Sequence, residues 1–140
     1  MKLKLVGIFI ILIVGINASA QTLHLYGGDN HDVYLGCLNC NNMNTNSIWN
    51  QYGTYGNSYS LNSIWNQYGT YGNKYSLYCP WNGYGSNPPV VVDRQGNFYG
   101  YFTVNQYKSK RADFGLALTI YSYYNLIRSD VDKWYHKIFE

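Results

Sequence analysis

The sequence is poor in the side chains on which most enzyme chemistry depends. It has seven acidic residues, three histidines and three cysteines, and only 12% of its residues are charged. The motifs G-x-S-x-G and H-E-x-x-H and the P-loop are absent. The acids fall mostly in predicted turns and helix caps, so none pair for glycoside hydrolysis, which needs two carboxyls about 5–10 Å apart. We therefore expect a protein that is not an enzyme, with no catalytic residue and no cofactor.

Acidic residues stand beside a histidine in only one stretch, at Asp29, His31 and Asp32. Such a cluster could bind a metal ion. The preceding run, Gly27-Gly28-Asp29-Asn30, is typical of a turn. We assign no metal site there.

Long apolar runs are also missing after the first 20 residues. At the N-terminus, Lys2 and Lys4 precede and flank an apolar stretch, residues 5–16, and Ala18-Ser19-Ala20 is typical of a cleavage site. A membrane-spanning helix needs about 20 apolar residues, which this stretch does not reach. The sequence therefore predicts a signal peptide over residues 1–20, no membrane anchor after cleavage, and a secreted or periplasmic protein.

The mature chain is predicted to be one small domain, residues 21–140. The formal charge of the whole chain is +3, and the leader contributes Lys2 and Lys4, so eight basic and seven acidic residues leave +1. Lys108, Lys110 and Arg111 cluster, but the mature chain has no basic footprint of the kind that binds nucleic acid. We therefore expect no nucleic-acid partner.

Cys37, Cys40 and Cys79 should meet oxidising conditions in an exported protein. The simplest interpretation is a structural disulfide, either Cys37–Cys40 or one of these with Cys79, which leaves an odd thiol. A redox-active pair is an alternative, but that chemistry favours a sulfur at a helix N-terminus, and the Asn-rich stretch after Cys40 does not indicate a helix. A zinc site of the three sulfurs with His24 or His31 is a third, weakly indicated alternative.

A 16-residue repeat dominates the middle of the chain, over residues 47–86. Residues 47–62 and 63–78 are identical at 14 of 16 positions, and a third, diverged copy follows in phase. Trp49, Trp65 and Trp81 are spaced by 16. The residue at Cys79 is Ser in the earlier copies, at Ser47 and Ser63.

Each copy is predicted to form one or two helical turns. Ser47 and Ser63 are good N-caps, and Gly53 and Gly69 follow at the place where a short helix would end. Short strands joined by Gly-Asn turns are the alternative, since aromatic residues favour strands.

The chain carries 17 tyrosines and four tryptophans, and two interpretations compete for them. They could form a ligand-binding face, because flat aromatic rings beside amide groups suit sugar rings and protein partners. They could instead form the core of a protein short of Leu and Val. The predicted face comprises Trp49, Tyr52, Tyr55, Trp65, Tyr68, Tyr71 and Trp81.

The remaining pattern predicts an α+β fold. Short strands are expected at residues 22–26 and 33–38, and a hairpin at 90–104 around the turn 93–97. From Ala112 to Ile127 the apolar spacing becomes helical, and Ser129 is expected to cap a final helix. We therefore predict a small antiparallel sheet with the aromatic repeats and two C-terminal helices packed on it.

Four segments together carry a resemblance. They are Y-L-G-C-L-N-C at 34–40, the S-I-W-N-Q-Y-G-T-Y-G copies, N-P-P-V-V-V-D at 87–93 and G-N-F-Y-G at 96–100. The set resembles a group of uncharacterised exported bacterial proteins with C-L-x-C, tandem S-I-W-N-x-Y-G-x-Y-G units and a P-P-V-x-V-D…G-x-F-Y-G hairpin. The resemblance covers residues 34–104 and implies a secreted single domain without adding an activity or a catalytic residue.

The sequence thus predicts a secreted, non-enzymatic module that binds a glycan, a cell-envelope component or another envelope protein. A thiol-dependent protein that uses Cys37 and Cys40 for redox exchange or zinc is one alternative. A purely structural envelope protein is the other.

Overall fold

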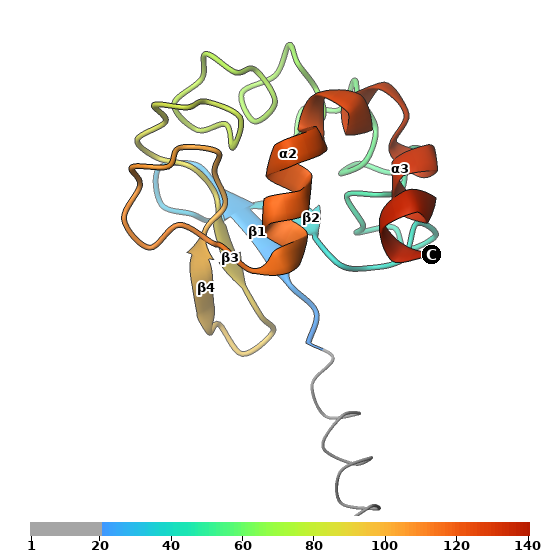
Figure 1. Ribbon diagram of the computed structural model, residues 1–140, viewed down its shortest axis with the longest axis horizontal. Coiled ribbons are helices and arrows are strands. Elements are labelled where there is room, and N and C mark those ends of the chain that lie inside the picture. The colour runs from blue at the N-terminus through green and yellow to red at the C-terminus, as the bar shows by residue number, and fades with distance from the viewer. Residues whose placement is uncertain (1–20) are drawn as a thin grey trace, which may run out of the picture.

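A computed structural model describes residues 21–140, and the predicted signal peptide lies outside this range. The fold is α+β, as expected, with a four-stranded antiparallel sheet in the order β2-β1-β3-β4 and two C-terminal helices (Figure 1). The strands are β1 (His24–Gly27), β2 (Val33–Cys37), β3 (Val90–Val92) and β4 (Phe98–Tyr101), and the helices are α2 (Gly115–Ser129) and α3 (Val131–Phe139).

The sheet is formed by two hairpins that meet between β1 and β3. Leu25 of β1 lies opposite Val91 of β3, and both are fully buried. Their neighbours His24 and Tyr26 lie opposite Val92 and Val90, and these four side chains are only partly buried. Alternation along the strands therefore gives the sheet one core face and one half-open face.

The repeats form a continuous series of hydrogen-bonded turns, and the expectation of helical turns was wrong. From Asn57, backbone N–H groups bond to carbonyls three residues earlier at Ser60, Ser63, Asn66 and Gly69, and Asn73 then bonds four residues back to Gly69. Four three-residue steps and one four-residue step make up the 16-residue period. Asparagine promotes this path, because its side-chain oxygen accepts from the N–H two residues on, as Asn66 does from Tyr68.

Successive copies are joined by their tryptophans. The indole Nε1–H of Trp65 donates to the carbonyl of Ile48 at 2.7 Å, and that of Trp81 donates to Ile64 at the same distance. Trp49 begins the series by donating to Leu38 at 2.8 Å. The three rings form a ladder, with centroids 5.9 Å and 5.6 Å apart.

This ladder is the centre of the core, which corrects part of the predicted binding face. Trp49, Trp65 and Trp81 are 0%, 1% and 2% exposed. Each indole N–H has an internal acceptor, as a buried tryptophan requires. The three rings therefore belong to the packing of the core, and the exposed part of the predicted face is reduced to tyrosines.

Both helices pack against the tryptophan ladder. Tyr124 of α2 stacks on Trp81 with centroids 4.5 Å apart, and Tyr135 of α3 lies 6.2 Å from Trp49. The N-cap of α3 lies one residue after Ser129, where the sequence predicts it. Asp130 is the N-cap of α3, and its carboxylate accepts from the N–H of Lys133.

Among residues 21–140, neither helix is long and apolar enough to cross a bilayer.

Candidate functional site

The repeats present two rows of tyrosines to solvent. Tyr52, Tyr68 and Tyr84 occupy the same position in the three copies and are 87%, 79% and 85% exposed. Tyr59 and Tyr75 form the second row, at 84% and 79%. The buried tryptophan ladder fixes the spacing of both rows, because each copy is tied to the one before it.

A groove runs between these tyrosines and the C-terminal end of α2. An open pocket of about 680 Å³ has Tyr59 and Tyr68 on one side and Asn125 and Arg128 on the other. A pocket of about 340 Å³ adjoins it, shares Tyr68, Asn125 and Arg128, and adds Tyr75. We call the two together the tyrosine groove, defined by Tyr59, Gln67, Tyr68, Tyr75, Asn125 and Arg128.

Arg128 joins the two walls of the groove. Its Nη2 donates to the carbonyl of Gly72 at 3.3 Å, and its Nη1 lies 3.5 Å from Oε1 of Gln67. Its guanidinium also lies over the ring of Tyr124, 5.6 Å from the centroid. The cation is therefore held at the junction of the two pockets rather than swinging freely in solvent.

The groove places aromatic faces beside hydrogen-bonding side chains. Three tyrosine rings offer flat apolar faces, and the amides of Gln67 and Asn125 offer donors and acceptors. Across the part of the chain described, no Asp, Glu, His or Cys lines either pocket. The polar side chains of the groove are thus those of Tyr, Ser, Asn, Gln, Lys and Arg.

The other predicted tyrosines lie elsewhere. Tyr52 is exposed in the same row as Tyr68, but Tyr55 and Tyr71 are half-buried and dock the repeats on the sheet. A Cβ at Gly36 would lie 2.7 Å from that of Tyr55, so this close approach requires glycine, which also has φ of +110°. The structure therefore divides the predicted face between the core, the groove and the sheet.

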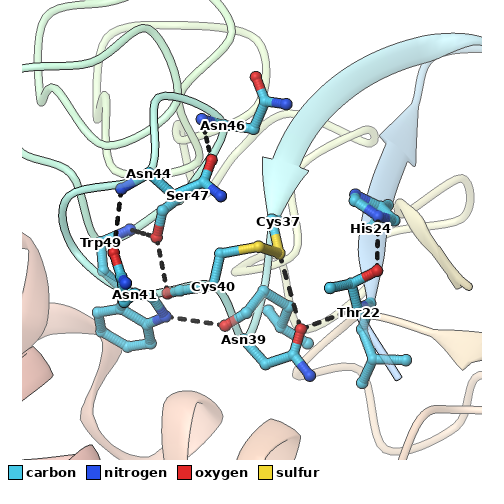
Figure 2. Close-up of a disulfide and its surroundings, with 12 residues drawn as sticks. Thr22, His24, Cys37, Asn39, Cys40, Asn41, Asn44, Asn46, Ser47 and Trp49 are labelled. Carbon is cyan, nitrogen blue, oxygen red and sulfur yellow. Dashed lines mark hydrogen bonds between the residues drawn. A yellow bond between two sulfur atoms is a disulfide. The ribbon is translucent and has the colours of Figure 1, made fainter. Parts of the chain in front are cut away.

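The cysteines form one of the pairings left open by the sequence. Cys37 and Cys40 are disulfide-bonded with Cα atoms 5.6 Å apart, and Cys79 is free and buried. The disulfide joins the end of β2 to the segment that leads into the first copy of the repeat, beside Trp49 and Ser47 (Figure 2). It thus braces the chain at Leu38, whose carbonyl accepts from the first tryptophan of the ladder.

The three sulfurs lie either in a disulfide or in the buried interior. Cys37 is fully buried at the end of β2, where its sulfur is bonded to that of Cys40. Burial raises the pKa of the Cys79 thiol to about 12. Within residues 21–140, no three His, Cys, Asp or Glu side chains are grouped as metal ligands.

The Asp29, His31 and Asp32 stretch forms a hydrogen-bonded turn. Asp29 accepts from the hydroxyl of Tyr78 at 2.7 Å, and a ring nitrogen of His31 lies 3.0 Å from the carbonyl of Pro88. These contacts tie the β1–β2 turn to the last part of the repeats. The structure thus gives two of the three side chains a role in holding segments together.

A further pocket, of about 490 Å³, lies on the half-open face of the sheet beside His24, Tyr26 and Tyr34. The hydroxyl of Tyr34 lies 2.8 Å from Nδ1 of His24. Burial is the main cause that lowers the pKa of His24 and raises the pKa of Tyr34 to about 12. The pair is therefore neutral at pH 7 and joined by a hydrogen bond.

Sequence reasoning missed several residues of the groove. Tyr59 and Tyr75 carry the same 16-residue signal as the residues that were predicted, so the repeat itself could have found them. Asn125 and Arg128 carry no such signal, because they come from α2, in which Arg128 lies 61 residues after Gln67, and they meet the repeats only through the fold.

Comparison with known proteins adds no identification, since no family model, curated protein or solved structure matches the chain.

Proposed function

We propose that this is a secreted or periplasmic, non-enzymatic module that binds a glycan of the cell envelope or its surroundings in the tyrosine groove. The observation that carries the proposal is the line of exposed rings at Tyr59, Tyr68 and Tyr75 facing the polar side chains of α2. Exposed aromatic side chains in a concave, polar site are typical of recognition.

The composition of the groove favours sugar over a purely apolar ligand. Sugar rings present apolar faces that stack on aromatic rings and hydroxyls that bond to amides. Gln67 and Asn125 supply amides beside Tyr68. A bulky apolar ligand would leave these amides without partners, which costs binding energy.

The regular spacing of the rings also favours a chain-like ligand. Tyr59 and Tyr75 occupy equivalent positions in successive copies, and Tyr68 lies in both pockets between them. A glycan offers one ring after another in the same way. The repeat therefore gives a physical reason for a site that continues from one pocket into the next.

The disulfide supports placement outside the cytoplasm, since such bonds persist in oxidising compartments. The predicted leader over residues 1–20 supports export in particular.

The test is a binding titration of the exported protein with a panel of neutral and charged envelope oligosaccharides. We expect Tyr68→Ala to weaken binding by about fivefold or more, as loss of an aromatic contact of about 1 kcal/mol would do. Tyr84→Ala is the matched control, because Tyr84 has the same position in the third copy and does not line the groove.

Failure of every oligosaccharide to bind would contradict the proposal. An equal loss of affinity in Tyr68→Ala and Tyr84→Ala would place the ligand on the exposed tyrosine row outside the groove.

A further inference from the structure

We propose that the ligand of the tyrosine groove is an acidic glycan, whose carboxylates are bound by Arg128 and Lys74. This inference rests on the proposed function and specifies its ligand. Three observations support it. Arg128 makes only weak, neutral contacts, the groove is lined by positive charge, and the one groove position at which the two near-identical copies differ carries a lysine in the second copy.

Arg128 makes only neutral contacts. Its nitrogen atoms reach a side-chain amide oxygen at 3.5 Å and a backbone carbonyl at 3.3 Å, and both distances are long for a guanidinium. Its Nε is buried and has no hydrogen-bond partner. Throughout residues 21–140, no carboxylate forms a salt bridge with it, since the two ion pairs present both involve His136.

A partly buried arginine in this state has unused binding capacity. Guanidinium offers five N–H donors in a planar fork that matches a carboxylate, and buried charged groups are usually paired. An anion in the groove would pair with the Nη groups of Arg128, whose present contacts are long and neutral. The aromatic ring of Tyr124 beneath the guanidinium leaves the edges of the fork for such a contact.

Lys74 adds a second cation at an informative position. The first two copies differ at only two places, and one is Ser58 in the first copy against Lys74 in the second. Ser58 lines the larger pocket of the groove and Lys74 the smaller one. The second copy has therefore added positive charge to the groove while keeping its tyrosines.

The positive charge of the groove is not balanced by acidic side chains. Arg128 and Lys74 line it, and the two pockets that form it have no acidic side chain in their linings. Asp29 and Asp32 line a separate pocket with Tyr71. A concave site lined by charge of one sign attracts ligands of the other sign.

The tyrosines decide which kind of anion fits. A small ion such as phosphate could satisfy Arg128 alone, but it would leave Tyr59, Tyr68 and Tyr75 without a contact. A sugar chain with carboxylates uses both the rings and the cations. Uronic acid polymers have this combination of apolar ring faces and regularly spaced charge.

The test compares an oligogalacturonate with its fully methyl-esterified form of the same length, by isothermal titration with the exported protein. Esterification removes the charge and keeps the sugar rings. We expect the ester to bind about tenfold more weakly or worse, because it loses charge-assisted hydrogen bonds. Binding of the acid should also weaken as salt is added, and that of the ester should not.

Two variants and a control test whether Arg128 and Lys74 cause the preference for the acid over the ester. Arg128→Gln and Lys74→Ser should each reduce the preference for the acid over the ester, and Lys74→Ser merely restores the residue of the first copy. Lys133→Ser is the control, because Lys133 is an exposed cation on α3 outside the groove. If Arg128→Gln does not fold, Lys74→Ser and the ester comparison still decide the result.

The outcomes separate this inference from the proposed function. Equal binding of acid and ester, lost in Tyr68→Ala, would overturn the acidic ligand and leave a glycan-binding groove. Displacement of the oligogalacturonate by inorganic phosphate at similar concentration would reduce the site to a small-anion site and overturn the inference. No binding of any oligosaccharide would overturn both.

Discussion

The indole Nε1–H of Trp65 donates a 2.7 Å hydrogen bond to the backbone carbonyl of Ile48, in the preceding copy of the repeat. The bond is buried, and Trp81 repeats it one copy later toward Ile64. Neighbouring copies are thus joined by hydrogen bonds from a side chain to the backbone, whereas neighbouring strands of a sheet are joined by bonds between backbones. The groove depends on this link, because the tyrosines of successive copies are spaced by it.

Replacement of Trp65 by Ala should therefore destabilise the protein strongly. We expect a loss of about 3–5 kcal/mol in the free energy of unfolding, from the cavity, plus the cost of leaving the Ile48 carbonyl unsatisfied. Denaturant unfolding followed by circular dichroism measures it. Tyr68→Ala, at an exposed position of the same copy, should change the same quantity by about 0.5 kcal/mol or less.

Gly72 should be far less tolerant of substitution than Gly83. A Cβ at Gly72 would overlap the backbone carbonyl of Asn66, whereas a Cβ at Gly83 would meet nothing within 4 Å. We expect Gly72→Ala to lower the free energy of unfolding by about 1–3 kcal/mol, as an overpacked site does. Gly83→Ala should be neutral or slightly stabilising, and a loss equal to that of Gly72→Ala would show that the turn path is wrong.

The sequence predicts the regular elements of the fold better than it predicts the path of the repeats. The strand at Val90–Val92 follows from a run of β-branched residues before a turn, the amphipathic helix after Ala112 follows from helical apolar spacing, and both are present. Ser before Ile-Trp is typical of an N-cap and therefore predicts helical turns in the repeats. In the structure Ser63 does accept from the N–H of Trp65, but the chain continues into another turn because Asn66 then offers a competing side-chain acceptor.

Cys79 should behave as a substitute for the serines of the earlier copies. Its sulfur accepts from the N–H of Trp81 at 3.2 Å, as Ser63 accepts from Trp65 at 3.1 Å. We expect Cys79→Ser to keep the free energy of unfolding within about 1 kcal/mol at pH 7. Cys79→Ala should cost about 1–3 kcal/mol, because it leaves a buried N–H without a partner.

The same variant should change the alkaline limb of the stability profile. Burial raises the pKa of the Cys79 thiol to about 12 in the folded protein from its ordinary value of 9.0, so the unfolded chain loses this proton first. The Cys79 thiol thus has no effect on stability below pH 9, and its effect lowers stability as the pH rises from 9 toward 12. Cys79→Ser should delay this fall to above pH 10, where Tyr34 and Tyr121 contribute for the same reason. An unchanged profile would mean that the thiol is accessible.

Removal of the disulfide should reduce stability without abolishing binding. The bridge closes a loop of sequence separation 3, for which chain entropy predicts a contribution of about 2 kcal/mol. We expect the double variant Cys37→Ala, Cys40→Ala to lose about that much in denaturant unfolding. Ligand affinity should stay the same, because the groove is lined by neither cysteine. Loss of ligand binding in the folded double variant would favour the thiol-dependent alternative.

The sequence predicts the tyrosine side of the groove in part and does not predict the side formed by α2, for a physical reason. Tyr68 belongs to the repeat, and any periodic pattern of aromatic residues indicates that some of them share a face. Periodicity could not tell that Trp65 faces inward and Tyr68 outward, since both recur every 16 residues. Arg128 depends on how α2 crosses the turns, and no local signal encodes that crossing.

The central claim is that ligand lies between the repeats and α2, and chemical-shift mapping tests it most directly. The backbone amides of the isotope-labelled protein would be followed during titration with an oligogalacturonate. The account predicts that the shifts concentrate at residues 58–75 and 124–129, and that Tyr84 and the sheet stay unperturbed. Shifts centred on the half-open face of the sheet around His24 and Tyr34, or no shifts at all, would contradict it.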